Sequence, residues 1–102
     1  MIPNTVWIGG LGYNVEYDDK LNDGSSMLYG QIDYDEAAIR LNNRAGMSKQ
    51  MLELTLWHEI LHGIFLHFNK AEWRNDEELV DTVARGIYMV LADNPGLSEH
   101  NA

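Results

Sequence analysis

The segment from Ser48 to Asn69 most constrains the fold, because apolar residues cover most of the circumference of the helix that it predicts. These apolar residues are Met51, Leu52, Leu54, Leu56, Trp57, Ile60, Leu61, Ile64, Phe65 and Phe68. A surface helix buries one stripe, whereas a helix that is apolar on most sides packs against several neighbours. Ser48 is a favoured N-cap residue, so we expect the helix to start there and to end near His67 or Asn69. The rest of the chain must therefore pack around a central helix.

The residues before this helix predict a small β-sheet. β-branched and aromatic residues, partly alternating with polar ones, mark four strand-like segments: 5–9, 12–17, 28–34 and 37–42. Gly9-Gly10 and Asp35-Glu36 are turn signals within two hairpins, and a polar loop at 18–26 joins the hairpins. This order predicts an antiparallel sheet of three to four strands, arranged as a meander.

The residues after the central helix predict a second helix. A polar connection at 69–76 leads into a helix from about Asp76 to Ala92, and Asn94-Pro95-Gly96 would end it. The apolar residues of this helix share one face: Val80, Val83, Ala84, Ile87, Val90 and Leu91. We therefore predict a single α+β domain over residues 1–102, in which the sheet is followed by two helices.

Charge and composition argue against several classes of function. The chain carries 16 acidic and 7 basic side chains, a formal net charge of −9, which argues against binding to nucleic acid or to an anionic membrane. No run of about 18 apolar residues marks a membrane span, and the first residues lack the basic start and long apolar run of a secretory signal. Cysteine is absent, so we expect a reducing cytoplasm as the location.

The predicted central helix contains the motif HExxH, formed by His58, Glu59 and His62. Histidines four residues apart lie on one helical face, so both imidazoles can bind one Zn²⁺ at about 2.0–2.1 Å. Glu59 would then act as general base towards a zinc-activated water in peptide hydrolysis. Burying two imidazoles and a carboxylate without partners is costly, and a bound cation removes that cost.

Another interpretation places the same three side chains on an exposed polar stripe, where they form local salt bridges without a metal. His67 requires separate treatment. At 100° per residue, it lies about 180° from His58 and about 140° from His62, so a regular helix cannot bring it to the same ion. We therefore expect His67 to be a helix-end or surface residue and His100 to be a tail residue.

A catalytic zinc usually has three protein ligands, and the second helix offers the third. On a helical wheel with Val80 at 0°, Glu77 lies at about +60°, Asp76 at about −40° and Glu78 at about 160°. Glu78 would point to solvent, whereas Glu77 or Asp76 can face the histidines; Glu77 reaches further. Asp81, one turn later, could hydrogen-bond to a histidine. Asp76, Glu77 and Glu78 could instead only stabilise the N-terminus of the helix, through their interaction with the helix dipole.

With HEILH placed between TLW and GIFLHF, and followed by EELVDTVARGIYMVLADNPGL, the chain resembles small phage-encoded zinc metallopeptidase-like proteins related to the ImmA/IrrE-type metallo-endopeptidases, in the gluzincin class. The resemblance extends to IGGLGYNVEY and YGQIDYDEAAIRL. It implies a minimal zincin-like fold with a small antiparallel sheet, an active-site helix and a second helix that carries an acidic ligand. Carried over residue by residue, His58 and His62 would be zinc ligands, Glu59 the catalytic glutamate and Glu77 the acidic ligand.

The sequence thus predicts a zinc-dependent metallo-endopeptidase that hydrolyses a protein or peptide substrate in the cytoplasm, which would be the host cytoplasm if the chain is phage-encoded. The alternative is a catalytically inactive zinc-binding module that interacts with a host or phage protein. The small size and the lack of a second domain to form another cleft wall favour that alternative. A metal-free structural domain is the third hypothesis.

Overall fold

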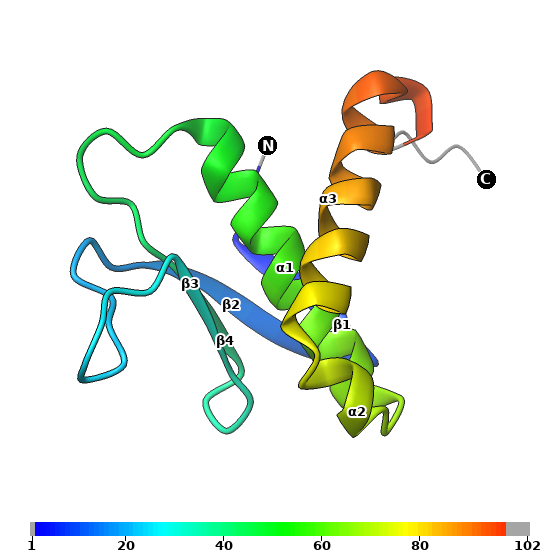
Figure 1. Ribbon diagram of the computed structural model, residues 1–102, viewed down its shortest axis with the longest axis horizontal. Helices are drawn as coiled ribbons and strands as arrows, with labels where there is room; N and C mark the ends of the chain where they lie inside the picture. Colours follow the sequence, from blue (N-terminus) through cyan, green and yellow to red (C-terminus); the bar gives the residue numbers. More distant parts are fainter. Residues whose placement is uncertain (1, 98–102) are drawn as a thin grey trace.

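The computed structural model describes residues 2–97, and four short strands form its sheet (Figure 1). The strands are β1 (Thr5–Ile8), β2 (Leu11–Tyr17), β3 (Gly30–Asp33) and β4 (Ala38–Leu41). Each lies within one of the four predicted segments or begins one residue before it. Gly9 and Gly10, with φ of 58° and 82°, form the turn between β1 and β2, as predicted, because both positions need a left-handed backbone.

The sheet has the strand order β1-β2-β4-β3, so the predicted antiparallel meander is wrong. β1 pairs with β2 and β3 pairs with β4 in antiparallel hairpins, but β2 and β4 are parallel. The loop after β2 carries the chain across the sheet, so β4 rather than β3 lies beside β2. This order places the apolar strand β4 in the interior of the sheet, where Ile39 and Leu41 are fully buried. Burial of β4 thus decided a topology that turn signals cannot reveal.

The α+β class is confirmed, with three α-helices after the sheet: α1 (Lys49–His67), α2 (Ala71–Arg74) and α3 (Glu77–Asp93), and then a 3₁₀ turn, η1 (Pro95–Leu97). Ser48 caps α1, because its side chain accepts a hydrogen bond from the backbone N–H of Met51. The predicted polar connection at 69–76 in fact contains the short helix α2. None of the described helices combines the length and the apolar character that crossing a bilayer requires.

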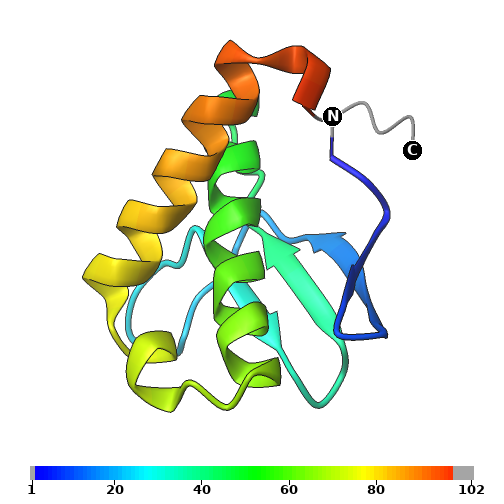
Figure 2. The ribbon, with the colours of Figure 1, turned by 90° about the vertical axis from the view of Figure 1, so that its right-hand side faces the viewer.

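α1 is the central element, packed between the sheet and α3 (Figure 2). Its sheet side joins a core cluster of Ile8, Tyr13, Ile39, Leu41, Leu56 and Ile60. Its other side joins a second cluster of Leu61, Val80 and Ala84. Trp57 packs against both clusters. Two buried sides explain why apolar residues cover most of this helix, whereas α3 is apolar on one face.

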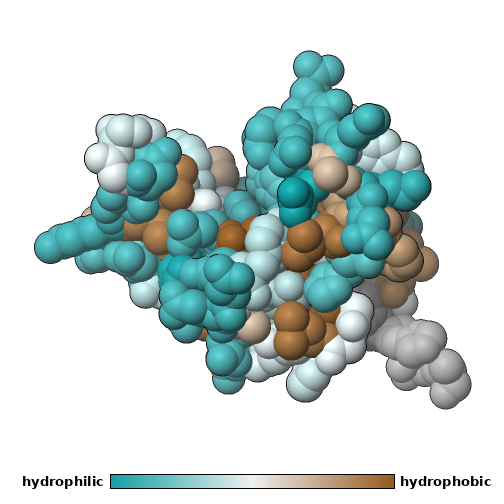
Figure 3. Space-filling model, turned by 90° about the horizontal axis from the view of Figure 1, so that it is seen from below, coloured by the Kyte–Doolittle hydropathy of each residue, from teal (hydrophilic) through white to brown (hydrophobic). Residues whose placement is uncertain are grey.

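Hydrophilic residues cover most of the face seen from below, with smaller hydrophobic areas between them (Figure 3). Several large apolar side chains are exposed in the described part of the chain, with Trp7 and Phe68 both 72% accessible. Apolar atoms contribute to the surface of any soluble domain, so isolated exposed residues of this kind need no partner.

Candidate metal centre and cavity

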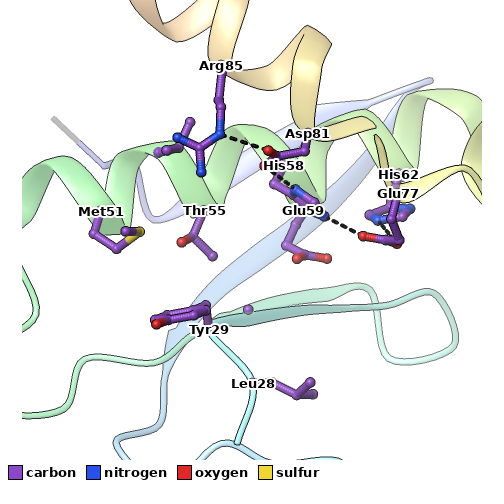
Figure 4. Close-up of a pocket in the computed structure, with 12 residues that line it drawn as sticks. Leu28, Tyr29, Met51, Thr55, His58, Glu59, His62, Glu77, Asp81 and Arg85 are labelled. Carbon is purple, nitrogen blue, oxygen red and sulfur yellow. Dashed lines mark hydrogen bonds and ion pairs between the residues drawn. The ribbon is translucent and has the colours of Figure 1, made fainter. Parts of the chain in front are cut away.

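α1 and α3 together bring three potential metal ligands to one point (Figure 4). His58 and His62 project from one face of α1, and Glu77 projects from the first turn of α3. The Nε2 atom of His58 lies 3.1 Å from one carboxylate oxygen of Glu77, and the Nε2 atom of His62 lies 3.0 Å from the other. The imidazole centroids are 5.0 Å apart. One carboxylate therefore spans both imidazoles.

This donor set fits a zinc ion. One ligand atom from each of His58, His62 and Glu77 lies within 4.8 Å of the other two. Bonds of about 2.0–2.1 Å to a single ion then require only small side-chain adjustments. Two imidazoles and a carboxylate leave the fourth tetrahedral position for water or substrate, which is typical of catalytic rather than structural zinc sites.

Both histidines also have a partner outside the donor set. The Nδ1 atom of His58 lies 3.4 Å from an oxygen of Asp81, as the helical wheel allowed. A ring N–H of His62 donates to the backbone carbonyl of Arg74, in α2. Burial lowers the pKa of His62, and the charge of Glu77 acts in the opposite direction. Such outer partners fix the orientation of an imidazole and direct its other nitrogen towards a metal.

Glu59 lies between α1 and the sheet and is buried, with 8% of its surface exposed. Burial raises the pKa of its carboxyl group to about 7. The nearby His58 and a backbone hydrogen bond from Ile32 oppose this rise, whereas the charge of Glu77 adds to it. A carboxylate in this position lies beside the donor set without belonging to it.

Gly30, the first residue of β3, allows the sheet to approach this part of α1 closely. A Cβ atom at this position would lie 2.5 Å from Cγ2 of Thr55 and 3.2 Å from both Cγ and Oε2 of Glu59. Any larger residue would therefore displace the strand or the side chains on which Glu59 rests. The close approach buries Glu59 and fixes its place.

The three ligands and Glu59 line a cavity of about 630 Å³ between α1, α3 and the segment that leads into β3. The remaining lining residues are Leu28, Tyr29, Gly30, Met51, Leu54, Thr55, Asp81 and Arg85. His62 and Glu77 lie at one end, and Met51 lies at the other, towards the N-terminal half of α1 (Figure 4). The cavity is large enough for part of a peptide, which is a common size for a ligand site.

The structure brings His58, Glu59, His62 and Glu77 to one cavity. Their roles as metal ligands and general base stay predictions. Of the competing acids, Glu78 is exposed, as expected, and Asp76 caps α3 by accepting a hydrogen bond from the backbone N–H of Leu79. This leaves Glu77 as the acid that faces both histidines.

His67 does not contribute to this site, as its angular position predicted. Its Nε2 atom lies 3.2 Å from the hydroxyl of Tyr13, on the side of α1 that meets the sheet. His100 lies outside the described residues. Tyr88 also lies outside this site, because its hydroxyl donates to Glu53 at 3.4 Å and it does not line the cavity.

Sequence reasoning missed Gly30 and Arg85 as residues of the cavity. Arg85 follows Asp81 by four residues, and Asp81 follows Glu77 by the same interval, so all three share a face of α3. That spacing could have revealed Arg85. Gly30 gave no local signal, because its importance comes from the approach of a distant helix.

No protein-family model, no curated protein and no solved structure matches this chain. The resemblance to phage-encoded metallopeptidase-like proteins therefore stays a prediction. Any function proposed for this chain must therefore rest on the chemistry of the donor set and the geometry of the cavity.

Proposed function

We propose that this protein is a zinc-dependent metallo-endopeptidase. The observation that carries the proposal is the convergence of two imidazoles from α1 and one carboxylate from α3, beside the buried Glu59. His58, His62 and Glu77 would hold the ion. Bound there, Zn²⁺ would polarise the scissile carbonyl and make a water molecule more acidic.

Glu59 is the residue that would move protons. Its carboxylate would take a proton from the attacking water and later deliver it to the leaving amine. The close packing of Gly30 and Thr55 against Glu59 limits its rotation, so the carboxylate stays at the metal end of the cavity. Asp81 would accept a hydrogen bond from Nδ1 of His58, which leaves Nε2 free to bind the ion.

The position of β3 supports a peptide as the substrate. β3 is an edge strand of the sheet and contributes Gly30 to the cavity. An extended peptide can bind along a sheet edge through backbone hydrogen bonds, which recognise any sequence. A peptide bound along β3 would pass the metal ligands on α1. The lack of cysteine keeps a cytoplasm as the proposed location.

The test combines metal analysis with hydrolysis. We expect about one zinc per chain, the stoichiometry of a single catalytic site, in protein purified without chelators or a polyhistidine tag. Casein or a peptide library should be cleaved, and Glu59→Gln should slow cleavage by about 10²–10⁴-fold while retaining zinc. Glu53→Gln, on the same helix but outside the cavity, is the matched control and should cleave like the wild type.

Two results would contradict the proposal. Protein that holds zinc but cleaves no faster than Glu59→Gln is a zinc-binding module at this site, because any hydrolysis then does not depend on the proposed general base. Protein that binds no zinc even when the ion is supplied in excess would leave the donor set without the proposed role, and a metal-free structural domain would remain.

A further inference from the structure

Arg85 is a charged residue of the cavity to which the proposed hydrolysis assigns no role. It is the one lysine or arginine among the twelve residues that line the cavity, where it lies with the carboxylates of Glu59, Glu77 and Asp81. A cation placed at the wall of a substrate cavity favours a negatively charged group on the ligand.

The guanidinium of Arg85 is held in place from one side. Its Nε donates to an oxygen of Asp81 at 2.8 Å, and the other oxygen of Asp81 lies 3.4 Å from His58. No protein partner of the two Nη atoms is found among residues 2–97. The Asp81 contact therefore orients the guanidinium and leaves two parallel N–H donors, the arrangement that binds a carboxylate in a bidentate manner.

The guanidinium also lies close to the end of the cavity that contains the three potential metal ligands. Arg85 follows Glu77 by eight residues, about 12 Å along the helix axis, but its side chain turns back towards Asp81 (Figure 4). A single carboxylate thus separates the guanidinium from the imidazole of His58. An extended peptide advances about 3.3–3.6 Å per residue, so a group within one or two residues of the scissile bond can reach Arg85.

The guanidinium is accessible to a ligand. The side chain of Arg85 is 58% exposed, so a ligand can approach it from solvent. Met51, Leu54 and Tyr29 line the same cavity and offer apolar surface to the rest of the ligand.

We propose that Arg85 selects peptides that carry a carboxylate within two residues of the cleaved bond, supplied either by an acidic side chain or by the C-terminus. This inference rests on the proposed peptidase function for its substrate, and it identifies Arg85 as the specificity-determining residue. The rival role is purely structural: Arg85 would neutralise Asp81 and so help to position His58.

The test measures binding, so it does not depend on turnover. The probes are N-acetylated alanine pentapeptides with one central leucine, in which glutamate or glutamine occupies each other position in turn. Every peptide is made with a C-terminal carboxylate and with a C-terminal amide. Affinities are measured by calorimetry on the zinc-supplemented Glu59→Gln protein, which should bind peptides without cleaving them.

In at least one glutamate/glutamine or carboxylate/amide pair, we expect the peptide with the carboxylate to bind about tenfold tighter than its neutral partner, as a charge-assisted bidentate contact allows. A glutamate preference identifies the side chain as the source, and an acid-over-amide preference identifies the C-terminus. Adding Arg85→Gln should abolish this preference and leave the affinity for the neutral peptide within about twofold, the usual limit for a surface substitution. Lys70→Gln, which removes a positive charge outside the cavity, should retain the preference.

A structural role for Arg85 predicts a different result, because a misplaced His58 would weaken both members of each pair equally. Equal binding of the members of every pair, or a complete lack of binding, would overturn the inference. A lack of zinc or of hydrolysis in the wild type would instead contradict the peptidase proposal. Arg85→Lys should keep part of the preference, since it retains the charge but loses the fork of two donors.

Discussion

The three histidines of α1 lie in two different environments, although one helix carries them all. His58 and His62 face α3 and the cavity, where Glu77 contacts both. His67 faces the β1–β2 hairpin, where its ring meets that of Tyr13 edge-on, with centroids 6.1 Å apart. Angular position on the helix, rather than residue type, thus decides which histidines face Glu77 and the cavity.

A glycine permits close packing at both places. Gly9, in the β1–β2 turn, lies so close to His67 that a Cβ atom would come within 2.8 Å of its ring. A Cβ atom at Gly30 would lie 2.5 Å from Thr55 and 3.2 Å from Glu59. The sheet thus reaches α1 at both places, but of the two glycines only Gly30 lines the cavity that holds Glu59. We therefore expect the contact of Gly9 with His67 to support the fold alone, and the contact of Gly30 with Glu59 to support the site as well.

The largest expected effect distinguishes the two sets of histidines. His62→Ala removes a proposed ligand and should weaken zinc binding by more than about 100-fold, since loss of an outer partner alone costs about 10–100-fold. His67→Ala should leave zinc affinity within about twofold. Titration against a fluorescent chelator measures both. Equal losses in the two variants would show that the comparison is wrong.

The next effect concerns the residue behind His58. Asp81→Asn keeps the size of the side chain but removes its charge, and it should weaken zinc binding by about 10–100-fold. Glu78→Gln, which alters an exposed acid on the same helix, is the control and should leave the affinity unchanged. An Asp81→Asn protein with wild-type affinity would mean that this contact does not orient His58.

The two glycine contacts allow a test of packing. Gly30→Ala and Gly9→Ala should each lower the free energy of unfolding by about 1–3 kcal/mol, because each added methyl group collides with α1 side chains. Only Gly30→Ala should also reduce hydrolysis, because it displaces Glu59. Gly86→Ala, in α3 with no atom within 4 Å of the added group, should be neutral or raise stability by up to about 1 kcal/mol. Urea unfolding in EDTA measures all three variants.

If Gly9→Ala reduced hydrolysis as much as Gly30→Ala at equal stability, the two glycine contacts with α1 would not be functionally separate. If neither substitution lowered stability, the sheet could move away from α1 at little cost. Either result would remove the distinction between packing and site that the glycines suggest.

The smallest effect concerns the Tyr13 and His67 pair. Tyr13→Phe removes the hydroxyl and should lower the free energy of unfolding by about 1 kcal/mol, the usual value of one hydrogen bond. Zinc content and hydrolysis should not change. A loss of zinc in this variant, measured by elemental analysis, would connect the two environments that the structure separates.

Local patterns predicted much of the structure correctly. The alternation in 37–42 and the apolar periodicity around Trp57 depend on neighbours in the sequence, so they indicated β4 and α1 without tertiary information. The predicted α3 began one residue from the observed Glu77 and ended within one residue of Asp93. The helical wheel turned Glu78 towards solvent and left Asp76 or Glu77 facing α1, because an apolar face fixes how a helix is turned towards its neighbour.

The sequence by itself determined the helical spacing of His58 and His62, the one-sided α3 and the turn at Gly9-Gly10, because each follows from the backbone geometry of a few consecutive residues. Only the tertiary structure decided that β4 lies beside β2 and that Gly30 buries Glu59. These features depend on which distant surfaces exclude water together, and burial of that kind leaves no regular spacing in the chain.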